Sequence, residues 1–156
     1  FSGGFGLLTV SGIPKPQFYA LKLMSMAGVR KYKLPYTNDE IEVTVYESEK
    51  QKQIFVYRQR MKNVSEPAMP YRIKMELPQT VKNVTRYQID DTHCNPKKAW
   101  EDMGKPMELN KSEIEKIKEK SSLKGTAVEE RREDGNVVLE NKLGVNDLHC
   151  YVIELE

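Results

Sequence analysis

Cysteine, histidine and tryptophan are scarce in this chain of 156 residues, which has two, two and one of them. Two cysteines, Cys94 and Cys150, cannot build the disulfide framework of a small secreted domain, and we expect both to be free thiols. Charged residues interrupt every apolar run well before the roughly 18 residues that a membrane span requires. Because 25 Lys and Arg nearly balance 23 Asp and Glu, a nucleic-acid partner is not expected either.

The N-terminal stretch has no initiator methionine and no apolar leader, so we expect the chain to be part of a longer polypeptide. Its first 13 residues, FSGGFGLLTVSGI, are rich in glycine. Pro16 then begins a stretch with apolar residues at helical spacing, which ends at Gly28. A glycine-rich loop followed by one amphipathic helix is half of a βα unit. Residues 1–30 are therefore interpreted as the end of an α/β domain.

Beyond residue 30 the apolar residues alternate with polar ones, as they do in half-buried strands. The sequence predicts strands around residues 41–45, 53–57, 71–77 and 84–89, and two further strand signals close the chain at 137–139 and 148–153. Short alternating runs of this kind are typical of antiparallel sheets. The pair Asp134-Gly135 favours a hairpin turn. The run 148–153 is apolar on both faces, so we expect it in the middle of its sheet.

Two short helices are predicted between these strands. Asn95 begins the first, which carries Trp100, and Asn110 or Ser112 begins the second. The fold class is therefore mainly β: an antiparallel β-sandwich over residues 31–156, with a small helical insertion at about residues 95–121.

The densest group of reactive side chains is Asp90, Asp91, His93 and Cys94. A metal site needs three or four ligands at a suitable spacing, and the other histidine and cysteine are adjacent on a strand, so they point to opposite faces. Adjacency in sequence also does not make a Cys–His nucleophile. We therefore favour a hydrogen-bonded loop and helix cap, and we expect no metal and no cofactor.

A glycosidase needs two carboxylates, roughly 5 Å apart for retention of configuration. The acidic residues here lie mostly in mixed-charge runs, such as 113–119 and 129–134, which are typical of solvated faces. No catalytic pair can be assembled from them. Trp100 with Tyr71 and Tyr87 leaves an aromatic sugar-binding platform open, although a lone tryptophan on an amphipathic helix favours a place in the core.

Three stretches together resemble the C-terminal part of glycoside hydrolase family 39, the family of β-xylosidases and α-L-iduronidases. FSGGFGLLTVSGIPKPQFYALKLMSMAG is similar to the last strand, loop and helix of the family's (β/α)8 barrel. RYQIDDTHCNPKKAWEDMGKP is similar to a family stretch with Tyr, Ile-Asp, His, Asn, Trp and Met-Gly-x-Pro. EDGNVVLENKLGVNDLHCYVIEL is similar to the closing hairpin. The sequence departs from the family at Cys94, where a small polar residue is usual, and residues 59–70 do not align.

The resemblance implies an enzyme that hydrolyses glycosidic bonds with retention, through two Glu residues on a barrel upstream of Phe1. Residues 1–30 would then be the last βα unit of that barrel, and the chain would hold no catalytic residue. Its partner would be its own missing catalytic barrel, and the substrate a xylo-oligosaccharide. Because the active sites of such barrels lie at the C-terminal ends of strands, Phe1 and Phe5 are the expected substrate-binding residues.

Other interpretations stay open at this point. The chain is also consistent with a carbohydrate-binding module, with an α-L-iduronidase-type parent enzyme, or with an unrelated interaction sandwich. The apolar face of the helix at 16–27, which includes Leu21 and Met24, is expected to pack against the sandwich, a neighbouring molecule or a second copy. A homo-oligomer is thus one expected arrangement, and a cytoplasmic location is favoured over a secreted one.

Overall fold

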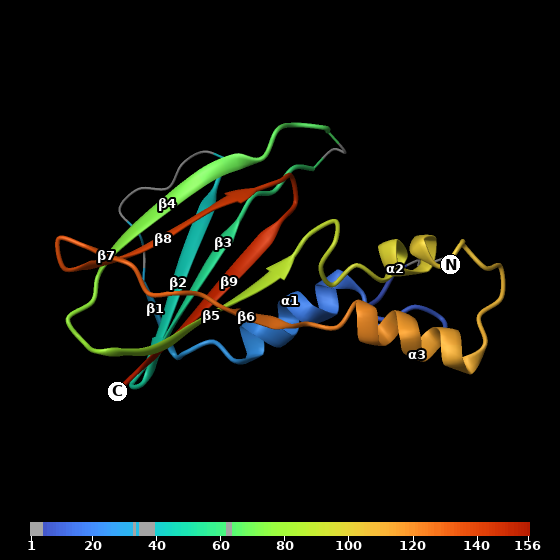
Figure 1. The fold of residues 1–156 in the computed structure, drawn as a ribbon, viewed down its shortest axis with the longest axis horizontal. Coiled ribbons are helices and arrows are strands. Elements are labelled where there is room, and N and C mark those ends of the chain that lie inside the picture. Colours follow the sequence, from blue (N-terminus) through green and yellow to red (C-terminus); the bar gives the residue numbers. More distant parts are fainter. Residues whose placement is uncertain (1–4, 33, 35–39, 62–63) are drawn as a thin grey trace. The chain divides into compact units, whose positions relative to one another are not determined.

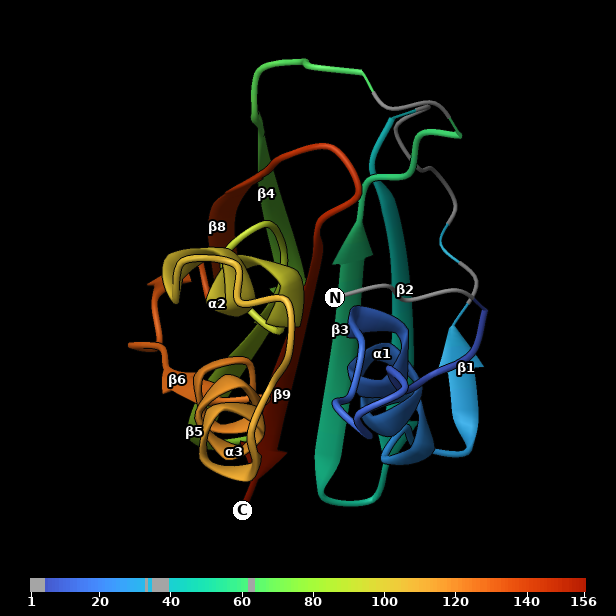
Figure 2. The ribbon, with the colours of Figure 1, turned by 90° about the vertical axis from the view of Figure 1, so that its right-hand side faces the viewer.

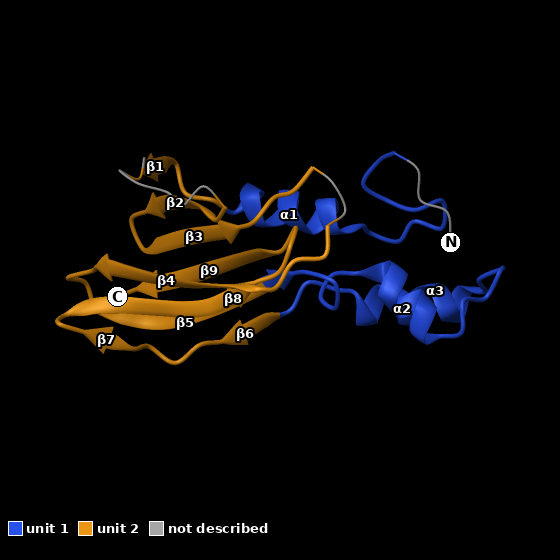
Figure 3. Cartoon of the chain, turned by 90° about the horizontal axis from the view of Figure 1, so that it is seen from above, with its two compact units in different colours: residues 1–26, 88–124 blue, residues 27–87, 125–156 orange. Residues whose placement is uncertain are grey.

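The computed structural model describes residues 5–32, 34, 40–61 and 64–156. The chain divides into two compact units, one of residues 1–26 and 88–124 and the other of residues 27–87 and 125–156 (Figure 3). We call them the helical unit and the sandwich unit. The predicted domain boundary near residue 30 stays a prediction.

The sandwich unit contains two sheets (Figure 1). The larger has the strand order β1-β2-β3-β9-β5-β6, and the smaller has the order β4-β8-β7. The strands are β1 (Arg30–Tyr32), β2 (Glu42–Ser48), β3 (Gln51–Tyr57), β4 (Met69–Glu76), β5 (Val81–Ile89), β6 (Gly125–Ala127), β7 (Arg132–Glu133), β8 (Asn136–Leu143) and β9 (Leu148–Leu155). Neighbouring strands pair antiparallel, for example β3 with β9 and β4 with β8. The mainly β, antiparallel fold class is confirmed.

Apolar side chains from both sheets form the core of the sandwich unit. Ile54 and Ile153 come from the larger sheet, and Val137 and Leu143 come from the smaller one; all four are fully buried. Strand β4 alternates regularly between half-buried and exposed residues, as its sequence predicts. Strand β9 lies between β3 and β5, so its expected central position is confirmed.

The predicted hairpin turn joins β7 to β8. Asp134 and Gly135 both have positive φ, 51° and 80°, as a two-residue turn of the type I′ class requires. Arg132 pairs with Val137 across this hairpin, and Glu133 pairs with Asn136. The turn therefore fixes the register of the smaller sheet.

The helical unit contains α1 (Pro16–Ser25), α2 (Pro96–Asp102) and α3 (Lys111–Lys120). The side chain of Asn95 caps α2 by accepting a hydrogen bond from the amide of Lys98. Asn110, rather than Ser112, caps α3, because Asn110 and Glu113 form a reciprocal capping box. None of the helices in the described residues is long and apolar enough to span a bilayer.

Helix α1 buries only part of its apolar surface. Tyr19 and Leu23 are buried, whereas Leu21 and Met24 are about half exposed, at 51% and 52%. The partner expected for this face stays a prediction. The run at residues 7–10, which resembles a barrel strand, makes only an isolated bridge from Leu8 to Pro14. A parallel strand needs neighbouring strands to pair with, and this chain supplies none to that run in the described residues.

Candidate functional site

The glycine-rich loop closes on itself through its own hydrogen bonds. The amide of Thr9 donates to the carbonyl of Ile13 (2.9 Å), and the hydroxyl of Thr9 accepts from the amide of Ile13 (3.1 Å). The amide of Gly12 donates to the carbonyl of Thr9 (2.9 Å), and Gly12 has a φ of +70°, which a residue with a side chain rarely adopts. The loop therefore has one defined shape from Thr9 to Ile13.

The first part of this loop is exposed to solvent, whereas its last residue is buried. Phe5 is fully exposed and Val10 is 96% exposed, whereas Ile13 is fully buried. Phe1, the other expected substrate-binding residue, lies outside the described residues. The structure thus places Phe5 on the surface with its whole ring accessible, at the start of a loop that is anchored at Ile13.

The loop at residues 90–95 is the hydrogen-bonded loop and helix cap that the sequence predicts. The carboxylate of Asp90 accepts from the amides of Thr92 (2.8 Å) and His93 (2.7 Å) and lies 2.8 Å from Nδ1 of His93. Burial raises the pKa of Asp90, but these hydrogen bonds to the ionised form outweigh it, so the pKa is lowered. The described part of the chain contains no group of three or more His, Cys, Asp or Glu placed to hold a metal.

Both cysteines are buried free thiols, as expected. Burial, with a smaller contribution from the charge of Asp90, raises the pKa of Cys94 to about 12. Burial alone raises the pKa of Cys150 to about 12. A cysteine nucleophile requires the opposite shift, because the thiolate is the reactive form. These thiols are therefore structural.

The carboxyl groups with a displaced pKa are also shifted away from the role of a general acid. Glu47, which binds Lys52 and Tyr32, and Glu133, which lies among Lys74 and two arginines, have lowered pKa values, as Asp90 does. For Glu133, burial opposes the shift and the positive neighbours outweigh it. A glycosidase acid needs a raised pKa, so that it holds its proton at neutral pH.

Two further carboxylates approach each other at the end of β3, where both bind the same arginine. Arg58 is buried and forms ion pairs with Glu40 and Glu66, and it donates to the carbonyl of Pro67 (2.9 Å). Arg60 also forms ion pairs with both glutamates. The two arginines neutralise the charges of both carboxylates. Arg58 also ties the segment that contains Glu66 and Pro67 to the end of β3, which is a structural role.

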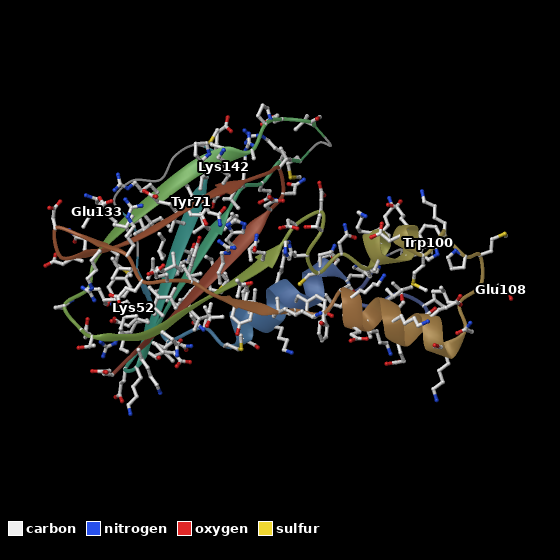
Figure 4. All side chains as sticks on the ribbon, in the orientation of Figure 1. Lys52, Tyr71, Trp100, Glu108, Glu133 and Lys142 are labelled. Carbon is white, nitrogen blue, oxygen red and sulfur yellow. The ribbon has the colours of Figure 1, made fainter. Side chains whose placement is uncertain are left out.

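Trp100 lies on α2 and Tyr71 lies on β4 (Figure 4), and both side chains are partly buried. Trp100 packs against the buried cluster of Ile13, Ala99 and Ile117, and its indole N–H donates to the carbonyl of Pro106 (2.9 Å). Trp100 is thus packed against a small core and is itself only partly buried.

The hydroxyl of Tyr71 lies 2.8 Å from Nδ1 of His149 and 2.6 Å from the hydroxyl of Tyr151. Because Tyr71 is on β4 and the other two are on β9, this network links the two sheets. Burial, and then the hydrogen bond to Tyr151, raises the pKa of Tyr71. The sequence analysis did not predict this network. The feature that could have indicated it is a histidine and a tyrosine two residues apart, on the same face of a strand whose other residues are mostly apolar.

A groove of about 660 Å³ lies over β4 and β8, lined by residues 70–72 and 140–142. Tyr71 is the one aromatic residue in this lining. Arg72 in the groove is already paired with Glu133 and Glu140. Sugar-binding platforms use exposed aromatic faces, which this groove does not offer.

The sequence pattern of the glycosyl hydrolases family 39 matches residues 1–138. The chain belongs to this family. A β-xylosidase of Caldicellulosiruptor saccharolyticus is 28% identical over 126 residues, which are 80% of this chain and 26% of that protein.

Solved structures show the same relationship at the level of the fold. A family 39 enzyme from Xanthomonas axonopodis pv. citri superposes with a TM-score of 0.75 at 20% identity, covering 100% of this chain and 33% of that one. A monomeric β-xylosidase from Caulobacter crescentus superposes with a TM-score of 0.70 at 23% identity, covering 99% of this chain and 34% of that one. The chain thus spans between a quarter and about a third of the length of these relatives.

Proposed function

We propose that this chain is the C-terminal accessory portion of a retaining glycoside hydrolase of the β-xylosidase type, which cleaves O-glycosyl bonds in xylo-oligosaccharides. The observation that carries the proposal is the family match over residues 1–138, together with relatives that are about three times as long. In this proposal the acid/base and nucleophile carboxylates belong to a barrel outside this chain. The lowered pKa values of Glu47, Asp90 and Glu133 make these three carboxyl groups unsuited to the acid/base role.

The proposed role of the chain itself is to support that barrel, its main partner. The sandwich unit has a continuous buried core between its two sheets, so it can provide a rigid base. The helical unit exposes apolar side chains at Phe5, Leu7, Leu8 and Val10. Exposed apolar surface of this kind is typical of regions that pack against another part of a protein. We assign residues 1–30 to the last βα unit of the barrel on this basis.

Phe5, and with it Phe1, is proposed to line the substrate pocket. The fully exposed ring of Phe5 supports this role, because a pyranose ring packs its C–H face against an aromatic side chain. The glycine-rich sequence around Phe5 allows the backbone to pass close to a ligand.

The proposal is tested by assaying hydrolysis of 4-nitrophenyl β-D-xylopyranoside by the chain alone and by the chain joined to the coding sequence that precedes Phe1. We expect no turnover by the chain alone and turnover by the longer protein, with the β-anomer released first in a proton NMR time course. Turnover by the chain alone, inversion, or an inactive longer protein would each overturn the proposal.

The assignment of Phe5 is tested in the same longer protein. Phe5→Ala is expected to raise KM for the aryl xyloside about tenfold, because the stacking contact with the sugar is lost. Phe18→Ala removes the same ring from α1, where Phe18 contacts the edge of Tyr19, and serves as the matched control. Equal KM values for the two variants would show that Phe5 does not contact the substrate.

A further inference from the structure

The glycine-rich loop and the helical insertion are distant in sequence but share one small core. Ile13, at the end of the loop, is fully buried against Ala99 of α2 and Ile117 of α3. Trp100 and Ile114 are packed around the same cluster. Helices α2 and α3 lie side by side (Figure 2), and each contributes one buried side chain to the cluster that contains Ile13.

Within the part of the chain that the structure describes, the other side of the loop has no comparable buried anchor. Between Phe5 and Val10 the described apolar side chains are exposed, and Phe5 itself is fully so. The hydrogen bonds of the loop join its own residues: Thr9 with Ile13, and the amide of Lys15 with the carbonyl of Leu7 (2.9 Å). These bonds fix the shape of the loop, whereas Ile13 fixes its place on the helical pair.

The helical pair is itself built as a rigid support. The capping box of Asn110 and Glu113 holds the start of α3, with both hydrogen bonds at 2.9 to 3.0 Å. The indole N–H of Trp100 bonds to the carbonyl of Pro106, which ties α2 to the connection leading to α3. The two helices therefore hold one geometry around the side chain of Ile13.

We infer that the α2–α3 helical pair positions the substrate loop, with Ile13 and Trp100 as its positioning residues. The inference rests on the proposed function, because it assumes that Phe5 contacts the sugar. Ile13 and Trp100 do not contact the substrate. They fix the position of the loop on the helical pair and therefore the position of Phe5. A displacement of about 1 Å at such a position is enough to weaken binding of the sugar.

The first test does not depend on activity. Ile13→Val removes one buried methyl group from the anchor, and Ile153→Val removes the same group from the core of the sandwich unit, where Ile153 is also fully buried. Hydrogen exchange of the amides of Thr9, Gly12 and Lys15 is followed in both variants. We expect exchange to become about tenfold faster in Ile13→Val only. Unchanged exchange in Ile13→Val, or an equal acceleration in both variants, would overturn the inference.

The second test uses the longer protein and the aryl xyloside. We expect Ile13→Val and Trp100→Phe to raise KM about threefold or more, while kcat changes less than twofold and Ile153→Val leaves both constants unchanged. A loss of kcat alone, or the same KM in all three variants, would contradict the inference. If the unmodified longer protein has no glycosidase activity, the proposed function fails, and the exchange experiment still decides whether the helical pair anchors the loop.

Discussion

The sandwich unit and the helical unit differ in how much of their structure is secured by burial. Eleven buried residues of the described chain form the core between the two sheets, whereas three form the core of the helical pair. The sandwich unit also links its sheets through the network of Tyr71, His149 and Tyr151. A large core resists local opening, and a small core that holds an exposed loop opens more easily. The comparison indicates a base with a large core in one unit and a loop support with a small core in the other.

The largest effect is expected from truncating the main core. Ile153→Ala should lower the free energy of unfolding by about 3 to 4 kcal/mol, because a cavity is left among closely packed side chains. Ile117→Ala makes the same truncation in the helical pair, where Ile117 is also fully buried. We expect a smaller loss there, about 2 kcal/mol, because a small cluster can collapse around the gap. Urea unfolding followed by circular dichroism measures both. Equal losses would show that the two cores are equally well packed.

The next largest loss of stability is expected at Gly28 in the sandwich unit, where two backbone segments are in close contact. A side chain at Gly28 would overlap the carbonyl of Glu47, and the amide of Gly28 donates to Oε1 of Gln53 (2.8 Å). Gly28→Ala should therefore cost about 2 to 3 kcal/mol of unfolding free energy. Gly104, in the helical unit, has positive φ but open space around it, so Gly104→Ala should cost about 1 kcal/mol from backbone strain alone. A larger cost at Gly104 than at Gly28 would refute this ranking.

The link between the sheets is tested by removing one hydroxyl group. Tyr71→Phe leaves His149 and Tyr151 without their shared partner, and we expect a loss of about 1 to 2 kcal/mol in thermal or urea unfolding. Tyr57→Phe removes an exposed hydroxyl that donates to Glu42 (2.7 Å), and it should cost less than about 0.5 kcal/mol. The role of the network would be disproved by a Tyr71→Phe protein as stable as the Tyr57→Phe protein.

The smallest effect is expected on the pH dependence of the free energy of unfolding, through Asp90 in the helical unit. Because the pKa of Asp90 is lowered in the folded chain, its contribution is present above the pKa of an unfolded aspartate, about 3.9, and is lost as the pH falls through the folded value. Asp90→Asn should therefore cost about 1 kcal/mol at pH 7 and nothing near pH 2. Asp91→Asn removes the same charge from an exposed neighbour and should cost little at either pH. A pH-independent cost of Asp90→Asn would contradict the assignment.

The pattern of apolar and polar residues along the chain was sufficient to predict most strands and helices of the fold. Apolar patterns predicted the strands that became β2, β3, β4, β5, β8 and β9. Alternation indicated strands with one exposed face, such as β4, and a continuous apolar run indicated β9, which is buried on both faces. The strands β1, β6 and β7 are two or three residues long, too short for any period to show. The choice of Asn110 over Ser112 as helix cap depended on Glu113, whose side chain completes the capping box.

The candidate site was predictable only in part. Exposure of Phe5 is compatible with the role expected for it, and the loop around Asp90 formed the hydrogen bonds that its composition favours. The burial of Arg58 between two glutamates could not be foreseen, because Glu40 and Glu66 reach it from different segments. The same holds for Tyr71 and His149, which are 78 positions apart.

The amino-acid sequence by itself determined the strands, the helix caps and the family, since these depend on residues that are close along the chain or on motifs read in order. Only the tertiary structure decided that Ile13 meets Ala99 and Ile117, and that a tyrosine on one sheet bonds a histidine on the other. Such pairs form because folding brings distant segments together to bury apolar surface, and no local pattern records which segments will meet.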